Sequence, residues 1–148
     1  MKTLCIVPCG KRKIWDKNPE AGPQKAKDVY IGPYAKKCIE YALAFYPECW
    51  CILSAKYGFL LPDDIIPGPY NVTFNKKSTS PVSFEELKRQ VNEKNLKSDR
   101  IVSLGGKNYT SMVKLLFSGS NIIIPFEGKT LGASIRAIGD SIKNELNK

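Results

Sequence analysis

The chain has 148 residues, enough for one domain to bury a hydrophobic core without disulfides or metals. Its 23 Lys and Arg against 14 Asp and Glu leave a net charge of +9, which favours partners such as nucleic acid or phosphorylated small molecules. It contains no histidine, so Ser-His-Asp catalysis, Cys-His catalysis and His-ligated metals are excluded. Any chemistry must use carboxylates, thiols, lysines, hydroxyls or backbone amides.

The sequence has no stretch near the roughly 20 apolar residues of a membrane span and no signal-peptide pattern. We therefore expect a cytoplasmic protein without a membrane partner, whose five cysteines are reduced. Cys5, Cys38, Cys49 and Cys51 fall in apolar segments and are expected to be buried. No two cysteines stand in loops at the spacing of a zinc site, so we expect neither a metal nor a cofactor.

Strands and helices are predicted to alternate along the chain. The strands are Leu4–Val7, Trp50–Leu53, Ile101–Leu104 and Ile122–Ile124. Helices are predicted over 34–45, 84–95, 108–117 and 130–146, with Ser83 and Glu86 forming a capping box before the second, and long loops over 10–27 and 71–81. This order indicates one domain over residues 1–148, a three-layer α/β/α fold with a mainly parallel sheet of about four strands.

Each predicted strand ends in a polar turn that carries glycine and lysine. The turns hold Gly10 and Lys11, Lys56 and Gly58, Gly105 to Lys107, and Gly128 and Lys129. In a parallel sheet these turns share one edge, where glycine exposes backbone N–H groups and lysine and helix N-termini add positive charge. Because no turn matches the P-loop or the dinucleotide fingerprint, the pattern predicts an anion site without naming the anion.

Cys9 is the one cysteine in a setting that favours reactivity. It follows the first strand, next to Gly10 and the basic run from Lys11 to Lys13. Nearby cations lower the pKa of a thiol, which would make Cys9 a nucleophile. The alternative is that Cys9 and Gly10 shape an anion-binding turn to which Lys11 or Lys13 supplies charge.

The segment from Ile52 to Tyr70 is the most distinctive part of the chain. Ser54, Lys56 and Tyr57 cluster at a strand end, Gly58 permits a sharp turn, and Asp63 and Asp64 follow. Prolines at positions 67 and 69 then fix the direction of Tyr70. These residues supply the groups that a histidine-free site needs. The alternative is that at least one of Asp63 and Asp64 caps a helix or a turn.

The same segment resembles a known family. The pattern Leu53-Ser54, a small residue, any residue and Tyr57-Gly58, then Pro, Asp and a later Pro69-Tyr70, resembles the signature of the YaaA peroxide-stress protein superfamily. Val29-Tyr30-x-Gly32 is similar to an element that precedes the signature there. The resemblance implies a YaaA-like α/β fold, DNA binding and a role in DNA protection or stress response, although the chain lacks a clear helix-hairpin-helix element.

Further candidates follow the later strands. Gly105 and Gly106 allow close backbone approach, Tyr109 offers a ring to stack on a base, and Glu127 would recognise a ribose hydroxyl or an exocyclic amine. Trp15 is a candidate lid residue, and Trp50 is expected in the core.

These residues together predict a protein that binds a nucleotide or a nucleic-acid base. If it is an enzyme, we expect chemistry at a glycosidic or phosphoribosyl centre. Lys56 or Lys11 would bind the phosphate, and Asp63 or Asp64 would stabilise developing positive charge or act as base. Tyr57, Tyr70 or Tyr109 would stack on the base. Lys76 and Lys77 are expected to be solvated surface and to matter less than Lys56 and Tyr57. The alternatives are a non-catalytic nucleic-acid-binding stress protein and a thiol sensor based on Cys9.

Overall fold

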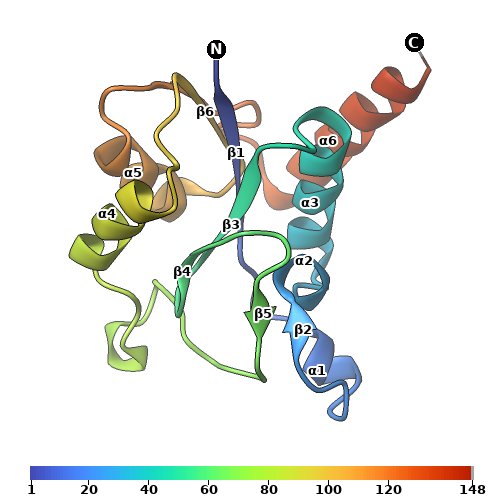
Figure 1. Ribbon diagram of the computed structural model, residues 1–148. Coiled ribbons are helices and arrows are strands. Elements are labelled where there is room, and N and C mark those ends of the chain that lie inside the picture. Colours follow the sequence, from blue (N-terminus) through green and yellow to red (C-terminus); the bar gives the residue numbers. More distant parts are fainter. Residues whose placement is uncertain (148) are drawn as a thin grey trace.

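Five strands form one sheet in the order β4-β3-β1-β6-β7 in the computed structural model, which describes residues 1–147 (Figure 1). They are β1 (Thr3–Pro8), β3 (Trp50–Ser54), β4 (Gly58–Leu60), β6 (Arg100–Ser103) and β7 (Asn121–Ile123). β1 pairs in parallel with β3 and β6, and β6 with β7, whereas β4 runs antiparallel to β3. The predicted mainly parallel sheet is confirmed, with one strand more than expected.

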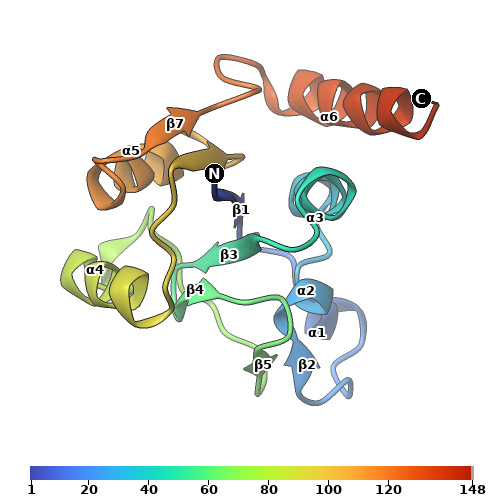
Figure 2. The ribbon, with the colours of Figure 1, turned by 45° about the horizontal axis from the view of Figure 1, so that its top comes forward.

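Helices cover both faces of this sheet. The long helices are α3 (Pro33–Phe45), α4 (Phe84–Glu93), α5 (Lys107–Leu116) and α6 (Leu131–Leu146). Figures 1 and 2 show α3 and α6 on one side of the sheet and α4 and α5 on the other. The predicted three-layer α/β/α fold is therefore confirmed, and the predicted helix ends agree with the observed ones to within about two residues.

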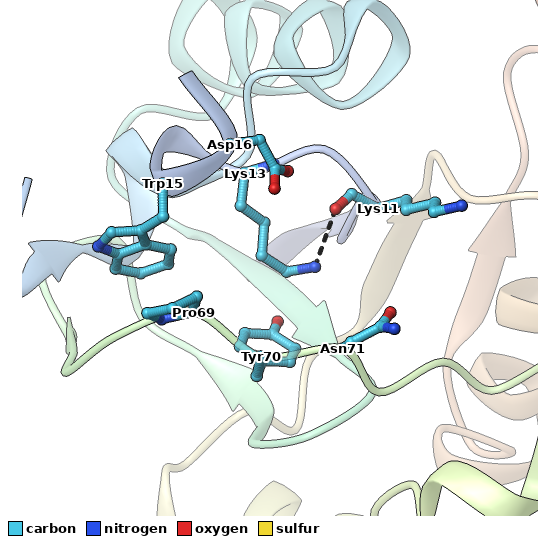
Figure 3. A pocket seen from close by; sticks show the side chains of 7 residues that line it. All are labelled: Lys11, Lys13, Trp15, Asp16, Pro69, Tyr70 and Asn71. Atoms are coloured by element: carbon cyan, nitrogen blue, oxygen red, sulfur yellow. Dashed lines mark hydrogen bonds between the residues drawn. The ribbon is translucent and has the colours of Figure 1, made fainter. Parts of the chain in front are cut away.

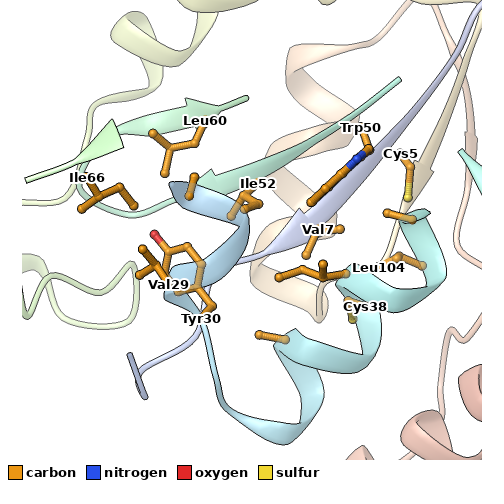
Figure 4. Close-up of a cluster of buried hydrophobic side chains, with 14 of the residues drawn as sticks. Cys5, Val7, Val29, Tyr30, Cys38, Trp50, Ile52, Leu60, Ile66 and Leu104 are labelled. Atoms are coloured by element: carbon orange, nitrogen blue, oxygen red, sulfur yellow. The ribbon is translucent and has the colours of Figure 1, made fainter. Parts of the chain in front are cut away.

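The period-2 alternation of each strand divides the core between the two faces. Cys5 and Val7 of β1 point into the cluster with α3, part of which is drawn in Figure 4, whereas Leu4 and Ile6 point toward α4 and α5. Trp50 is buried in the α3 cluster, as predicted. Cys5, Cys38 and Cys51 are buried as expected, but Cys49 is only half-buried because it lies just before β3.

The segment 10–27, predicted to be a loop, contains short elements. These are α1 (Ile14–Lys17), β2 (Gln24–Lys25) and the start of α2 (Ala26–Val29); β2 pairs with β5 (Ile65–Ile66). Trp15 anchors the segment, because its ring is 5% exposed and its indole N–H donates to the Gly22 carbonyl at 2.8 Å. Trp15 is thus part of the core and not a lid.

Ser83 caps α4 as predicted, since its hydroxyl accepts a hydrogen bond from the Glu86 N–H at 3.1 Å. The Glu86 carboxylate accepts from Arg89 and Gln90, so the predicted capping box is realised on one side only. In the part of the chain that the structure describes, no helix is long and apolar enough to cross a membrane.

Candidate functional site

The predicted convergence of strand-end turns is confirmed. Since β1, β3, β6 and β7 are parallel, the turns after them lie at one edge of the sheet. The chain leaves β1 for β3 on one side and returns to β6 on the other, so strand order switches beside β1. Ligand sites of open α/β sheets lie at such a switch point, here next to Cys9 and Gly105.

Two adjoining cavities open beside the end of β1. The first has a volume of about 440 Å³ and is lined by Lys11, Lys13, Trp15, Asp16, Pro69, Tyr70 and Asn71 (Figure 3). The second has about 490 Å³ and is lined by Cys9, Gly10, Lys11, Lys13, Asn71, Val72, Thr73, Asn75, Lys76, Thr79 and Tyr109. Because Lys11, Lys13 and Asn71 line both, we treat them as one site, the β1 cleft.

Lys13 is the central side chain of the β1 cleft. It is 5% exposed, and its Nζ donates to the Lys11 carbonyl at 3.0 Å (Figure 3). The same Nζ lies 4.5 Å from the centroid of the Tyr70 ring, within range of a cation–π contact. Burial lowers the pKa of Lys13 from its ordinary value, and Cys9 and Asp16 oppose that shift. A buried lysine nitrogen with room beside it is suited to donate to an anionic ligand.

A chain of three hydroxyls forms the floor beneath Lys13. The Ser54 hydroxyl oxygen accepts the N–H groups of Lys56 and Tyr57 at 3.2 and 3.1 Å, so its proton is left for Tyr70, 3.0 Å away. The Tyr70 hydroxyl in turn hydrogen-bonds with that of Tyr30. Two contacts use two of the three hydroxyl protons, which leaves one O–H that can donate to a ligand.

Burial keeps these phenols protonated. It raises the pKa of Tyr70 to about 12 and raises that of Tyr30 still further. Ser54 and Tyr30 are almost fully buried, at 0% and 2% exposure. The Tyr70 phenol that lines the cleft is therefore neutral at neutral pH and keeps a hydroxyl that can donate or accept a hydrogen bond.

Cys9 is half-buried, and its Sγ lies 3.1 Å from the Tyr109 hydroxyl. The Tyr109 ring also packs edge-on against Phe74, with centroids 5.7 Å apart, which fixes the loop after Tyr70 over the cleft. Burial is the main cause that raises the pKa of Tyr109, and the neighbouring Cys9 raises it further. Cys9, Gly10 and Tyr109, which the sequence predicts together at one edge, thus belong to one site.

Lys56 and Tyr57 line neither cavity of the β1 cleft and contact it through Tyr70. The Tyr57 ring packs edge-on against Tyr70, with centroids 5.4 Å apart, and Lys56 Nζ lies 5.6 Å from the Tyr70 ring. Lys56 is exposed. By contrast Lys76, expected to lie away from the site, lines the β1 cleft, so the expected ranking of Lys56 above Lys76 loses its basis.

The structure does not bring Asp63 and Asp64 into this site, and neither lines the β1 cleft. β4 runs antiparallel to β3, with Leu60 opposite Ile52, so the chain after Leu60 has turned back from the strand ends that border the cleft. Asp63 pairs with Lys25 and Lys27 at 3.7 and 3.5 Å. The Asp64 carboxylate accepts the Leu61 N–H at 2.8 Å, a turn cap of the kind considered as the alternative.

Gly58 serves the hairpin between β3 and β4 rather than the cleft. Its φ is +78°, and a Cβ there would lie 2.2 Å from the Gln90 side-chain oxygen. That oxygen accepts the Phe59 N–H at 2.8 Å, and the Gln90 amide donates to the Tyr57 carbonyl at 3.0 Å. The expected substrate-binding role of Gly58 is therefore replaced by a structural one.

The candidates after the last two parallel strands line a separate cavity, which we call the β6–β7 cavity. Its volume is about 630 Å³, and Gly105, Gly106 and Glu127 are among its lining residues. The one site expected from the sequence is thus divided in two. The first turn of α5 lies between them, with Tyr109 toward the β1 cleft and Lys107 toward the other cavity.

Several residues of the β1 cleft are not predicted as site residues from the sequence. Asp16 reaches it from α1, Asn71 and Thr79 from the loop after Tyr70, and Tyr30 contacts Tyr70 from the end of α2. Trp15, expected as a lid, lines the cleft as a buried side chain. The sequence signal that could have found these residues is the length of the loops predicted over 10–27 and 71–81, since long ordered loops are often functional.

Comparison with known proteins places this α/β chain in a family. The model of the family of unknown function DUF6884 matches residues 4–139, and the chain therefore belongs to that family. It is also similar to the uncharacterized protein YfjM of Bacillus subtilis (strain 168), with 42% identity over 151 residues that cover 99% of this chain and 100% of the relative.

The expected membership of the YaaA superfamily is therefore wrong, because the chain matches the DUF6884 family and YfjM and neither of these is a YaaA protein. The residues that suggested it have a local structural cause. Ser54 accepts the two N–H groups of the turn that follows it, and Gly58 adopts the positive φ of the hairpin. Such turn residues recur wherever a strand reverses, so a short pattern of them does not define a family.

Proposed function

We propose that this protein binds a nucleotide, or a nucleic-acid base with its phosphate, in the β1 cleft. The observation that carries the proposal is the position of Lys13, which is buried and lines both adjoining cavities. Lys11 and Lys76 add exposed positive charge at the mouth of the cleft. The net charge of +9 attracts the same class of ligand.

Aromatic and hydroxyl groups complete the complementarity to a nucleotide. Trp15 and Tyr70 line one end of the cleft and Tyr109 the other, and ring faces are a general means of holding nucleobases. Tyr70, the middle member of the hydroxyl chain, lines the cleft and supplies a neutral hydroxyl for hydrogen bonding. As part of the proposal we place the protein in the cytosol, where its five free cysteines stay reduced.

The proposal concerns binding and assigns no reaction. Chemistry at a glycosidic or phosphoribosyl centre was expected to use Asp63 or Asp64, and neither carboxylate lines the cleft: Asp63 pairs with Lys25 and Lys27, and Asp64 accepts the Leu61 N–H.

The test is isothermal titration of the purified protein with a panel of nucleoside monophosphates and triphosphates. Lys13→Met keeps the length of the buried side chain and removes its nitrogen, so we expect a loss of affinity of about ten- to a hundredfold. Lys88→Met is the matched control, since Lys88 is exposed on α4 on the opposite face of the sheet. Native folding of each variant is checked by circular dichroism.

Equal losses in the two variants, or no binding of any nucleotide at millimolar concentration, would reject the β1 cleft. Titration of a single-stranded oligonucleotide at several salt concentrations distinguishes a nucleotide cleft from the rival hypothesis, a basic surface that binds nucleic acid through its phosphates. A surface that tracks phosphates gives a log–log slope that grows with the number of contacts, whereas a cleft for one nucleotide depends on few charges.

A further inference from the structure

The β6–β7 cavity is a second candidate site, separate from the β1 cleft. It opens between the ends of β6 and β7 and the first turns of α5 and α6. Among the described residues, it shares no lining residue with the β1 cleft. What it could hold can therefore be argued without reference to the proposed nucleotide site.

Ser103 gives this cavity an unsatisfied polar group. It lines the cavity, its side chain is 1% exposed, and among the described residues its hydroxyl oxygen has no hydrogen-bond partner. Ser103 shares its sheet face with Ile101, which packs in the cluster with α5. A buried hydroxyl without a partner costs stability, so its retention points to a ligand that completes the bond.

The N-terminus of α5 meets the same cavity. Gly106 is its N-cap and has no side chain to accept the free amides of the first turn, which begins at Lys107. Gly105, Gly106 and Lys107 all line the cavity. The partial positive charge of a ten-residue helix and its uncapped N–H groups favour an anion at this point.

Three exposed lysines line the cavity: Lys107 at the start of α5, Lys114 in the last turn of α5 and Lys129 in the turn after β7. Glu127 is the acidic residue in the lining, and it is also exposed. The balance of charge around the cavity is therefore positive.

We infer that the β6–β7 cavity is a binding site for a phosphate group, with the Ser103 hydroxyl and the first-turn amides of α5 as donors. Lys107, Lys114 and Lys129 neutralise the phosphate charge from the rim. The ligand is a phosphate-bearing small molecule. This site is independent of the proposed function, since it uses other residues.

The probe is inorganic phosphate, titrated calorimetrically and by thermal shift at constant ionic strength against chloride. We expect saturable binding to the wild type, and a loss of affinity of about tenfold in Ser103→Ala and in Lys114→Ala. Glu127→Gln should raise the affinity for phosphate about two- to fivefold, because it removes the repulsion between one exposed carboxylate and the phosphate. Lys88→Ala on the opposite helix layer is the control and should bind as the wild type does.

Three results would overturn the inference. They are the absence of saturable binding, equal losses in Lys88→Ala and Lys114→Ala, and a loss in Lys11→Ala that Lys114→Ala lacks. The last result would place the phosphate in the β1 cleft. Ser103 is buried, so Ser103→Ala could fold poorly. Lys114 and Lys129 are exposed, so Lys114→Ala and Lys129→Ala test the site without a risk to folding.

Discussion

The β1 cleft and the β6–β7 cavity lie at the same edge of one sheet, yet they hold their polar groups in different ways. In the cleft, buried side chains bond to one another: Ser54 to Tyr70, Tyr70 to Tyr30, and Lys13 to the backbone. In the cavity, the donors are helix amides, exposed lysines and Ser103, whose hydroxyl has no hydrogen-bond partner within residues 1–147. The cleft is therefore part of what stabilises the fold, whereas the cavity adds little stability until a ligand fills it.

This contrast predicts that changes in the β3–β4 hairpin, whose Tyr57 packs against Tyr70 of the cleft, destabilise the protein more than matched changes at the cavity. The largest expected difference is between two glycines, Gly58 and Gly128, that share a φ of +78°. A Cβ at Gly58 would force Gln90 away from the Phe59 N–H, whereas one at Gly128 has nothing within 4 Å. We expect Gly58→Ala to lower the free energy of unfolding by about 3 kcal/mol and Gly128→Ala by about 1 kcal/mol, measured by urea denaturation.

The double variant Gly58→Ala with Gln90→Ala isolates the cause. If the collision with Gln90 is responsible, the cost of Gly58→Ala in the Gln90→Ala background falls to about that of Gly128→Ala. A cost that stays at its full value in that background would show that the backbone conformation alone sets it.

The sequence predicts the layers and the parallel strands of this fold well, because apolar runs and helical periodicity are local signals. It does not predict β4 or the position of Asp63. β4 has three residues, all buried, and its direction is set by the Gly58 turn and its contact with Gln90, 32 positions along the chain. Whether Asp63 lies at the cleft or beside Lys25 and Lys27 depends on that reversal, which no local pattern encodes.

The candidate site is likewise predicted where local signals define it and missed where it depends on contacts between distant parts of the chain. Cys9, Gly10 and Tyr109 were expected at one edge because they follow parallel strands, and they do meet. The contact of Tyr30 with Tyr70 joins residues 40 apart through two loops, so the hydroxyl chain could not be predicted. The division into two cavities depends on the packing of α5 between them, which is a property of the tertiary structure.

A second prediction compares two buried hydroxyls. Tyr70→Phe removes the partner of Ser54 and Tyr30, both nearly fully buried, and should lower the free energy of unfolding by about 1 to 2 kcal/mol. Ser103→Ala removes a hydroxyl that has no partner among the described residues, so it should leave the ligand-free protein equally stable or more stable by up to about 1 kcal/mol. Losses of equal size in urea denaturation would contradict the contrast between cleft and cavity.

The smallest effects are expected in alkaline solution, where two groups of the cleft act in opposite directions. The folded pKa of Tyr70 is raised to about 12, mainly by burial, so Tyr70 keeps its proton when folded and loses it near pH 10 when unfolded. Its contribution to stability is complete below pH 10 and is lost as the pH rises toward 12. Lys13 has a lowered pKa, so its unfavourable contribution is relieved as the pH rises toward its unfolded value of 10.5.

The two variants should therefore change the pH dependence of stability in opposite ways. Between pH 9.5 and pH 11, Tyr70→Phe should lose stability less steeply than the wild type, and Lys13→Met more steeply. Each difference is on the order of 1 kcal/mol per pH unit at most, because a single proton is involved. Urea denaturation at half-unit pH steps measures both slopes. Parallel curves for all three proteins would mean that neither side chain is buried in solution as it is in the structure, and the β1 cleft would lose the feature that sets it apart from the β6–β7 cavity.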